Sequence, residues 1–210
     1  MEVTSIQFQK RNRNRVSIYI DGKYTFSLDY VTFSRSGLHE GDSVTEEQIN
    51  SLSQKDEFFR ARDYALSLLS YRERTEHEMK SRLFQKGFTA GAVRSVIELL
   101  KDRGLIDDRS FAQKWVEGVI LHRPMGRMRA AHELRKKHVG DGIIEDVCTR
   151  MFSLEDEITL ARNAAQKKLG SMQGYPQELV KRRLNAFLKN RGFDFQIIQD
   201  LMKEYFSDRF

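Results

Sequence analysis

The chain has 210 residues and a net charge of +6; 40% of its residues are hydrophobic and 31% are charged. This balance argues against a disordered chain, and with a mean hydropathy of −0.59 and no long apolar run we expect neither a transmembrane helix nor a secretory signal. The one cysteine, Cys148, excludes an internal disulfide and a cysteine-based zinc cluster, so we expect a cytoplasmic protein.

The charge is distributed unevenly along the chain. Residues 60–141 carry 18 basic and 11 acidic side chains, so the middle of the chain holds the excess of positive charge. Such a region favours a polyanionic partner, which is either nucleic acid or an acidic protein surface.

The first part of the chain, residues 1–44, shows strand periodicity. The run 16–20 alternates apolar and polar residues, and Asp21-Gly22 follows it, a pair typical of a tight hairpin turn. The run 24–28 alternates again, and residues 3–9 offer a third strand. We predict a small antiparallel unit of three strands. The loop between its first two strands carries a weak basic cluster: Lys10, Arg11, Arg13 and Arg15.

Helical periodicity begins at Thr45. Thr45-Glu46-Glu47-Gln48 and Thr75-Glu76-His77-Glu78 both fit capping boxes, in which the threonine oxygen accepts a backbone N–H and the fourth side chain reaches back. They predict one helix from Thr45 to about Ser70 and a second that ends at Gly87. Phe88 then completes a Schellman pattern, in which a left-handed glycine closes the helix before an apolar residue.

One sequence pattern recurs in residues 82–88, 133–139 and 187–193, each time with a leucine at its second position. Each copy has helical patterns before and after it. One such unit is marginal alone, whereas stacked units share a core. We therefore predict a mainly α protein of three tandem three-helix repeats in an elongated, curved arrangement behind the β unit. The predicted domains are 1–44 (β unit), 45–105 (linker helix and first repeat), 106–153 (second repeat) and 154–210 (third repeat).

Common enzyme motifs are missing: the sequence has no phosphate-binding glycine loop, no dinucleotide-binding glycine pattern and no nucleophile elbow. His132 and Glu133 begin like a zinc-binding helix, but Lys136 stands where the second histidine is needed. We expect no metal and no other cofactor. Asp107-Asp108 could bind Mg²⁺ in a nuclease, yet Gly104 ends a helix just before it, so we expect a helix cap there.

Cys148 and Trp115 each have a structural and a functional interpretation. Both lie among apolar residues at helical spacing. We expect Cys148 to pack in a core rather than to act as a reactive thiol, and Trp115 to pack in a core rather than to stack on a base.

The basic clusters are the best functional candidates. Residues 123–137 carry six basic side chains against one acidic one. Arg127 and Arg129 stand near a predicted helix N-terminus, where the helix dipole disfavours cations. Because the sequence departs from this preference, we expect these residues to contact a partner. The alternative is a solvated helix face. The candidate residues for binding a protein partner or DNA are Arg127, Arg129, Arg135, Lys136, Lys137, Lys181, Arg182 and Arg183.

Several motifs resemble the RecX family. The segment 64–88, with Leu68-Leu69-Ser70 and Lys86-Gly87-Phe88, is similar to the opening signature of that family, and so is 104–112, with its Asp pair and Phe-Ala. Residues 123–137 resemble the segment that follows. The resemblance covers about residues 60–210. His138-Val139 departs from it, because the family usually has glycine there.

The resemblance implies an all-helical regulator, usually negative, of the RecA recombinase. Family members bind RecA, occupy the groove or the growing end of its filament on single-stranded DNA, and suppress ATP hydrolysis and strand exchange. It implies no catalytic residues and no cofactor. We accordingly expect a cytoplasmic monomer without a membrane partner that binds the filament, single-stranded DNA and also double-stranded DNA.

Two rival hypotheses belong to other classes. The first is a helical-repeat protein that acts directly on DNA, such as a transcriptional regulator. The second is a metal-dependent nuclease built around Asp107 and Asp108.

Overall fold

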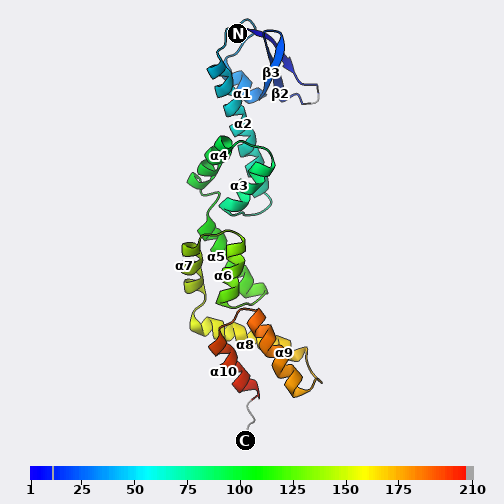
Figure 1. Cartoon of the computed structure of the whole chain (residues 1–210), viewed down its shortest axis with the longest axis vertical. Helices are drawn as coiled ribbons and strands as arrows, with labels where there is room; N and C mark the ends of the chain where they lie inside the picture. Colours follow the sequence, from blue (N-terminus) through cyan, green and yellow to red (C-terminus); the bar gives the residue numbers. More distant parts are fainter. Residues whose placement is uncertain (11, 207–210) are drawn as a thin grey trace. The chain divides into compact units, whose positions relative to one another are not determined.

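A computed structural model describes residues 1–10 and 12–206; Arg11 of the predicted basic loop lies outside the described residues. The described part contains a three-stranded sheet and ten helices (Figure 1). None of these helices combines the length and the apolar character that crossing a membrane requires. In chain order the elements are β1 (Val3–Phe8), β2 (Arg15–Ile20), β3 (Lys23–Asp29), α1 (Tyr30–Ser36), α2 (Glu46–Leu69), α3 (Glu76–Gln85), α4 (Ala90–Asp102), α5 (Asp108–His122), α6 (Arg127–Lys136), α7 (Asp141–Met151), α8 (Leu154–Gly170), α9 (Gln177–Asn190) and α10 (Phe195–Phe206).

The strands form an antiparallel sheet in the order β1-β2-β3, as the alternating pattern predicts. The turn between β2 and β3 uses positive φ angles at Asp21 (49°) and Gly22 (77°), which suits the twist of a tight hairpin. Val16, Ile18 and Leu28 are fully buried. The buried face packs on apolar side chains from α1 and from the start of α2.

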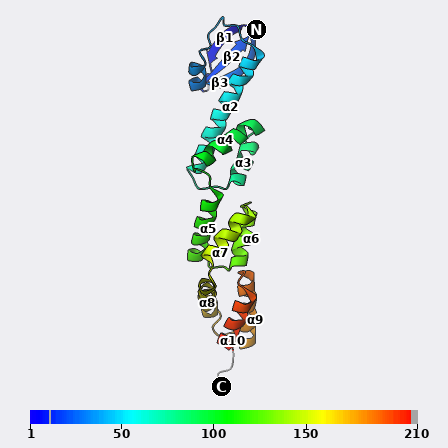
Figure 2. The ribbon, with the colours of Figure 1, turned by 90° about the vertical axis from the view of Figure 1, so that its left-hand side faces the viewer.

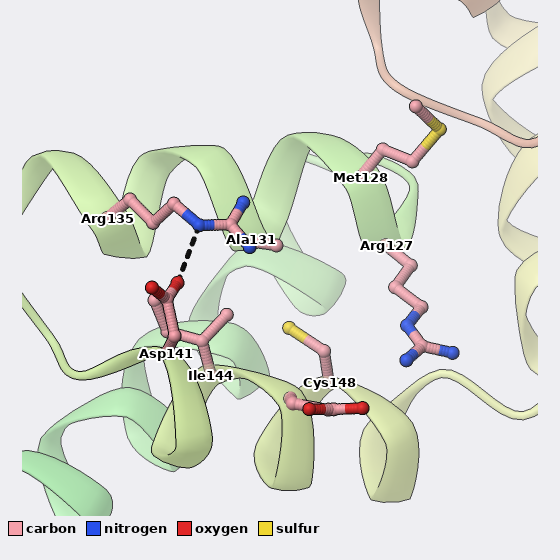
Figure 3. A pocket seen from close by; sticks show the side chains of 8 residues that line it. Arg127, Met128, Ala131, Arg135, Asp141, Ile144 and Cys148 are labelled. Atoms are coloured by element: carbon pink, nitrogen blue, oxygen red, sulfur yellow. Dashed lines mark hydrogen bonds and ion pairs between the residues drawn. The ribbon is translucent and has the colours of Figure 1, made fainter.

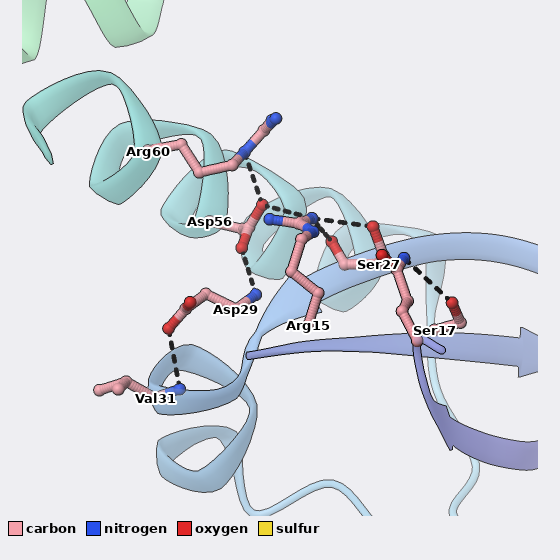
Figure 4. A network of polar contacts seen from close by, with 8 residues as sticks. Arg15, Ser17, Ser27, Asp29, Val31, Asp56 and Arg60 are labelled. Atoms are coloured by element: carbon pink, nitrogen blue, oxygen red, sulfur yellow. Dashed lines mark hydrogen bonds and ion pairs between the residues drawn. The ribbon is translucent and has the colours of Figure 1, made fainter. Parts of the chain in front are cut away.

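A buried carboxylate joins α2 to this sheet (Figure 4). Asp56 is 2% exposed; it accepts a hydrogen bond from the Asp29 backbone N–H (2.5 Å) and ion pairs with Arg15 (3.2 Å) and Arg60 (2.9 Å). Two arginines and an amide compensate the desolvated charge. Arg15, which the sequence places in a basic loop, therefore serves the fold of the N-terminal unit.

The helices form three-helix domains, and the predicted repeat is present in all of them. The anchor leucines Leu83, Leu134 and Leu188 are fully buried near the ends of α3, α6 and α9. After each anchor the chain closes with a Schellman turn, in which the backbone N–H five residues on donates to the leucine carbonyl (3.2–3.4 Å). Figure 2 shows α8, α9 and α10 of the third domain side by side.

The left-handed residue of these turns is Gly87, His138 or Gly192, with φ of 90°, 57° and 73°. His138 thus takes the conformation of the glycines that it replaces, and the departure from the family pattern leaves the turn intact. Its ring stacks on His77 with centroids 3.6 Å apart.

The chain divides into two compact units, residues 1–72 with 79–105 and residues 73–78 with 106–210. The short segment 73–78, which the sequence assigns to the first repeat, therefore packs with the second three-helix domain. Thr75 caps α3 by accepting the Glu78 N–H, and its hydroxyl donates to the Lys137 carbonyl (3.1 Å). The Glu76 N–H donates to Asp108 (2.8 Å).

Candidate basic interface

Two helices carry the eight basic residues that the sequence selects. Arg127, Arg129, Arg135 and Lys136 lie on α6, and Lys137 is its C-terminal cap residue. The other three lie in the first half of α9. Both helices belong to the same compact unit, and seven of the eight side chains are exposed; Lys137 is half-buried.

Arg127 begins α6, where the helix dipole disfavours a cation, and a buried acid offsets that cost. Glu157, at the start of α8, is 7% exposed and accepts the Arg127 backbone N–H (3.0 Å). Its carboxylate satisfies an otherwise unpaired amide and places negative charge at the helix N-terminus. Burial raises the pKa of Glu157 above its ordinary value, and the nearby Asp194 carboxylate adds to that rise, while hydrogen bonds from the Arg127 and Asp194 amides oppose it.

Arg127 and Arg135 stand at the two ends of a groove of about 430 Å³ between α6 and α7 (Figure 3). The Arg127 guanidinium donates to the Thr149 hydroxyl (2.9 Å), and Arg135 pairs with Asp141 (2.8 Å). Ala131 and Ile144 line the groove between them. The groove therefore offers an apolar floor between two cations, each already held by one partner.

Cys148 also lines this groove but is only 1% exposed, in the core of the second domain. Burial raises the pKa of its thiol, so the reactive thiolate form is disfavoured. The structural interpretation of this cysteine is therefore the one the geometry supports.

Arg129 and Lys136 lie away from that groove. Both approach Glu133, at 3.3 and 3.4 Å. Arg129 also donates to the carbonyl of Asn190 at the end of α9 (2.9 Å), so it joins the second domain to the third. The five cations of α6 and its cap thus do not share one face.

Lys137 turns towards α5. Its ammonium lies 5.9 Å from the ring centroids of Phe111 and Trp115, and both rings pack against the core of the second domain. Trp115 therefore has the core-packing role expected from the sequence. Lys86 lies over Tyr64 in the first domain (5.4 Å), at the corresponding repeat positions, so the cation–aromatic pair is part of the repeat.

On α9, Lys181 and Arg182 are exposed, and Arg183 lies over the Tyr175 ring at 5.0 Å. The matching of leucine anchors aligns Lys181 and Arg183 with Arg127 and Arg129. The cations of the two helices therefore occupy the same positions relative to the anchor leucines, in the first turn of α6 and in the second turn of α9.

The acidic pair is accounted for by helix capping. Asp107 precedes α5 and accepts the N–H groups of Arg109 (2.8 Å) and Ser110 (3.2 Å). Asp108 accepts the Glu76 N–H. Among the described residues no group of three or more acidic, histidine or cysteine side chains could hold a metal ion.

The list of candidate residues from the sequence omits three cations near the junction of the second and third domains. Arg123 and Arg191 line a pocket with Arg129, and Lys168 lies over the Phe187 ring beside it. Repeat alignment could have found Arg191, because it corresponds to Lys86 and Lys137. Arg123 belongs to the basic run 123–137 that the sequence analysis singles out, whereas Lys168 has no such signal.

Models of one protein family match most of the chain. The Regulatory protein RecX N-terminal domain matches residues 1–45, and the first, second and third three-helix domains of RecX match 61–100, 107–147 and 155–202. The chain belongs to the RecX family. The three-helix domains and the small sheet described above are therefore those of a RecX protein.

Relatives and solved structures agree with this assignment. The regulatory protein RecX of Pelodictyon phaeoclathratiforme is 35% identical over 68% of this chain and 87% of its own. That of Clostridium botulinum strain Eklund 17B is 29% identical over 97% and 95%. A crystal structure of regulatory protein RecX, 27% identical, superposes with a TM-score of 0.73 over 97% of this chain and 98% of that one. RecX from Lactobacillus salivarius, 24% identical, shares the fold with a TM-score of 0.60.

Proposed function

We propose that this RecX protein binds the RecA recombinase and its filament on single-stranded DNA, and that it mainly inhibits ATP hydrolysis and strand exchange. It acts as a regulator rather than as an enzyme, in the cytoplasm and as a monomer, without a cofactor. Membership of a family of regulatory proteins supports the general role. The basic side chains of α6 and α9 support a polyanionic partner.

The observation that carries the proposal is the repetition of exposed cations at equivalent repeat positions on α6 and α9. Lys181 and Arg183 correspond to Arg127 and Arg129 in the repeat, and both helices lie in one compact unit. Two neighbouring domains can therefore contact a repeating partner together, and modest local affinities then combine. A filament of identical subunits on DNA is such a partner.

Direct action on DNA, for example in transcriptional regulation, is the second candidate. The same basic helices favour it, because Lys and Arg neutralise backbone phosphates without any protein partner. Sequence-specific footprinting in the absence of RecA would support this function. Mg²⁺-dependent nuclease action finds less support, since Asp107 and Asp108 are occupied as backbone acceptors.

Titration into a RecA filament on single-stranded DNA, with ATP hydrolysis as the readout, tests the proposal. Inhibition far below one molecule per RecA subunit would point to capping of the filament end. Inhibition only near equal amounts would favour occupation of the filament groove. Unchanged hydrolysis, together with tight binding to naked DNA, would reject the regulator role in favour of direct action on DNA.

A further inference from the structure

Three arginines from two domains meet at one pocket of about 410 Å³. Arg123 follows α5 and Arg129 lies on α6, both in the second domain, while Arg191 ends α9 in the third. The two domains belong to the same compact unit. The remaining lining residues are Met125, Phe187 and Asn190.

Backbone contacts fix the walls of this pocket. The Gly126 N–H donates to the Arg191 carbonyl (2.9 Å), and a Cβ on Gly126 would lie only 2.2 Å from the Gly192 carbonyl oxygen. Because no larger residue fits there, the two backbones can approach this closely only with glycine. The close backbone contact therefore holds the second and third domains together at the pocket that the arginines line.

Two of the guanidiniums are held in place by neutral acceptors. Arg129 donates to the Asn190 carbonyl (2.9 Å), and Arg191 donates to the Pro124 carbonyl (3.2 Å). Glu133 contacts Arg129 at 3.3 Å, but it also serves Lys136. A guanidinium has five N–H donors, so one or two such bonds orient the group and leave donors for an anion. The pocket keeps a clear excess of positive charge.

The Phe187 ring distinguishes among possible anions. It is half-buried, with the Arg191 guanidinium 5.2 Å and the Lys168 ammonium 5.7 Å from its centroid. Single-stranded nucleic acid combines a phosphate with a base that can stack on an aromatic or guanidinium plane. An acidic peptide has no phosphate with a nucleobase beside it, and a duplex keeps its bases stacked on one another. The combination favours a single strand.

We propose that this pocket binds a backbone phosphate of single-stranded DNA through Arg123, Arg129 and Arg191, with the adjoining base against the Phe187 side. The inference rests on the proposed function for the identity of the nucleic acid. It adds a defined site at the junction of the second and third domains, away from the groove between α6 and α7.

Arg123→Gln is the primary test, because this side chain is exposed and its backbone N–H, which caps α5, is retained. The probe is fluorescein-labelled oligo(dT) of about 30 nucleotides, bound by the full chain without RecA and followed by fluorescence anisotropy. We expect a loss of affinity of roughly 3- to 10-fold and a salt slope shallower by about 0.7, the value for one phosphate contact on a single strand. Arg94→Gln on α4, an equal loss of charge at an exposed site, should leave both unchanged.

Arg191→Lys provides a second variant, which keeps the charge but loses the planar fork. It should also weaken binding, while an unchanged thermal unfolding midpoint shows that the junction is intact. Wild-type affinity and slope in Arg123→Gln would overturn the proposal. Equal weakening by Arg94→Gln would also overturn it, because it would show a diffuse charge effect.

Inhibition of RecA ATP hydrolysis, measured on the same variants, separates this proposal from the proposed function. If DNA binding by Arg123→Gln is normal but inhibition is lost, the pocket contacts protein; the inference fails and the regulator role stands. If DNA binding falls while inhibition persists, the phosphate site is supported, and this contact with DNA is unnecessary for regulation.

Discussion

His138 occupies a backbone conformation that residues with a side chain usually avoid. Its φ of 57° lies in the same left-handed region as those of Gly87 and Gly192 in the equivalent turns, and its ring stacks on His77. For L-residues the left-handed region costs about 1–2 kcal/mol relative to glycine. The stack with His77 offsets part of this cost.

Replacement of this residue by glycine should therefore stabilise the protein slightly. We expect His138→Gly to raise the free energy of unfolding by up to about 1 kcal/mol, measured by urea denaturation. Gly87→Ala is the reverse change in the first domain, where a Cβ meets no atom within 4 Å, and it should destabilise by a similar amount. A destabilised His138→Gly would mean that the histidine stack contributes more than the strain costs.

Glu157, at the junction of the second and third domains, makes the stability of the folded protein depend on pH. Burial raises its pKa in the folded state. The stability associated with a raised carboxyl pKa is fully present below the unfolded pKa, about 4.3, and is lost as the pH rises through the folded value. Removal of the Glu157 charge should therefore change the free energy of unfolding most at neutral pH.

Glu157→Gln tests this reasoning through the pH dependence of the difference from wild type. Relative to wild type, the variant should gain stability as the pH rises above about 4, because it escapes the cost of a buried charge. Urea midpoints over this range provide the measurement. Glu155→Gln, which removes an exposed acid from the same first turn, is the matched control. Parallel profiles for both variants would contradict the assigned role of Glu157.

At the scale of elements, two glycines occupy equivalent positions with different surroundings. Gly126 precedes α6 and Gly140 precedes α7, and neither provides a side-chain cap. A Cβ on Gly126 would lie 2.2 Å from a backbone oxygen, whereas one on Gly140 would meet nothing within 4 Å. The comparison isolates the close approach of the second and third domains.

Gly126→Ala should destabilise the protein by at least about 2 kcal/mol more than Gly140→Ala, because backbone atoms at the junction cannot move aside as a side chain can. Gly140→Ala measures the cost of alanine at a helix N-cap, so the difference between the two variants reports the clash at the junction. Thermal unfolding and limited proteolysis near residue 153 provide the measurements. Equal effects of the two variants would show that the junction relaxes freely.

The helices were predictable because their signals are local. The capping box of Thr45 is present with both of its hydrogen bonds (2.8 and 3.2 Å), and Asp107 caps α5 as its position after Gly104 indicates. The anchor leucines revealed the repeats because a buried position recurs in each copy. Tertiary contact between domains has no such local signature.

The site was less predictable for this reason. The sequence grouped Arg127, Arg129 and Arg135 as one run, but a helix turns 100° per residue, so Arg129 projects away from the groove that Arg127 and Arg135 line. The structure instead brings Arg129 together with Arg191, far away in the chain. Neither Glu157 nor the close contact at Gly126 could be inferred without the packing of the two domains.

At the scale of the whole molecule, the exposed cations of α9 test whether charge drives filament binding. Lys181 and Arg182 are both exposed, so their reversal leaves the core around Leu184 intact. Lys181→Glu with Arg182→Glu should weaken binding to a RecA filament on single-stranded DNA by about tenfold or more at low salt. The loss of affinity with added salt should also become shallower, because fewer counterions are released on binding.

Reversal of Arg94 and Arg103 on and just after α4 is the matched control, since both are exposed and the change in net charge is the same. If charge at the α9 surface is what matters, the control pair should retain most of the affinity and the original salt slope. Equal losses in both pairs would show that net charge alone steers the protein to the filament. If Lys181→Glu with Arg182→Glu binds the filament as tightly as wild type, Lys181 and Arg182 are not part of the interface. The proposal that the second and third domains bind the filament together would then lose its contact in the third domain.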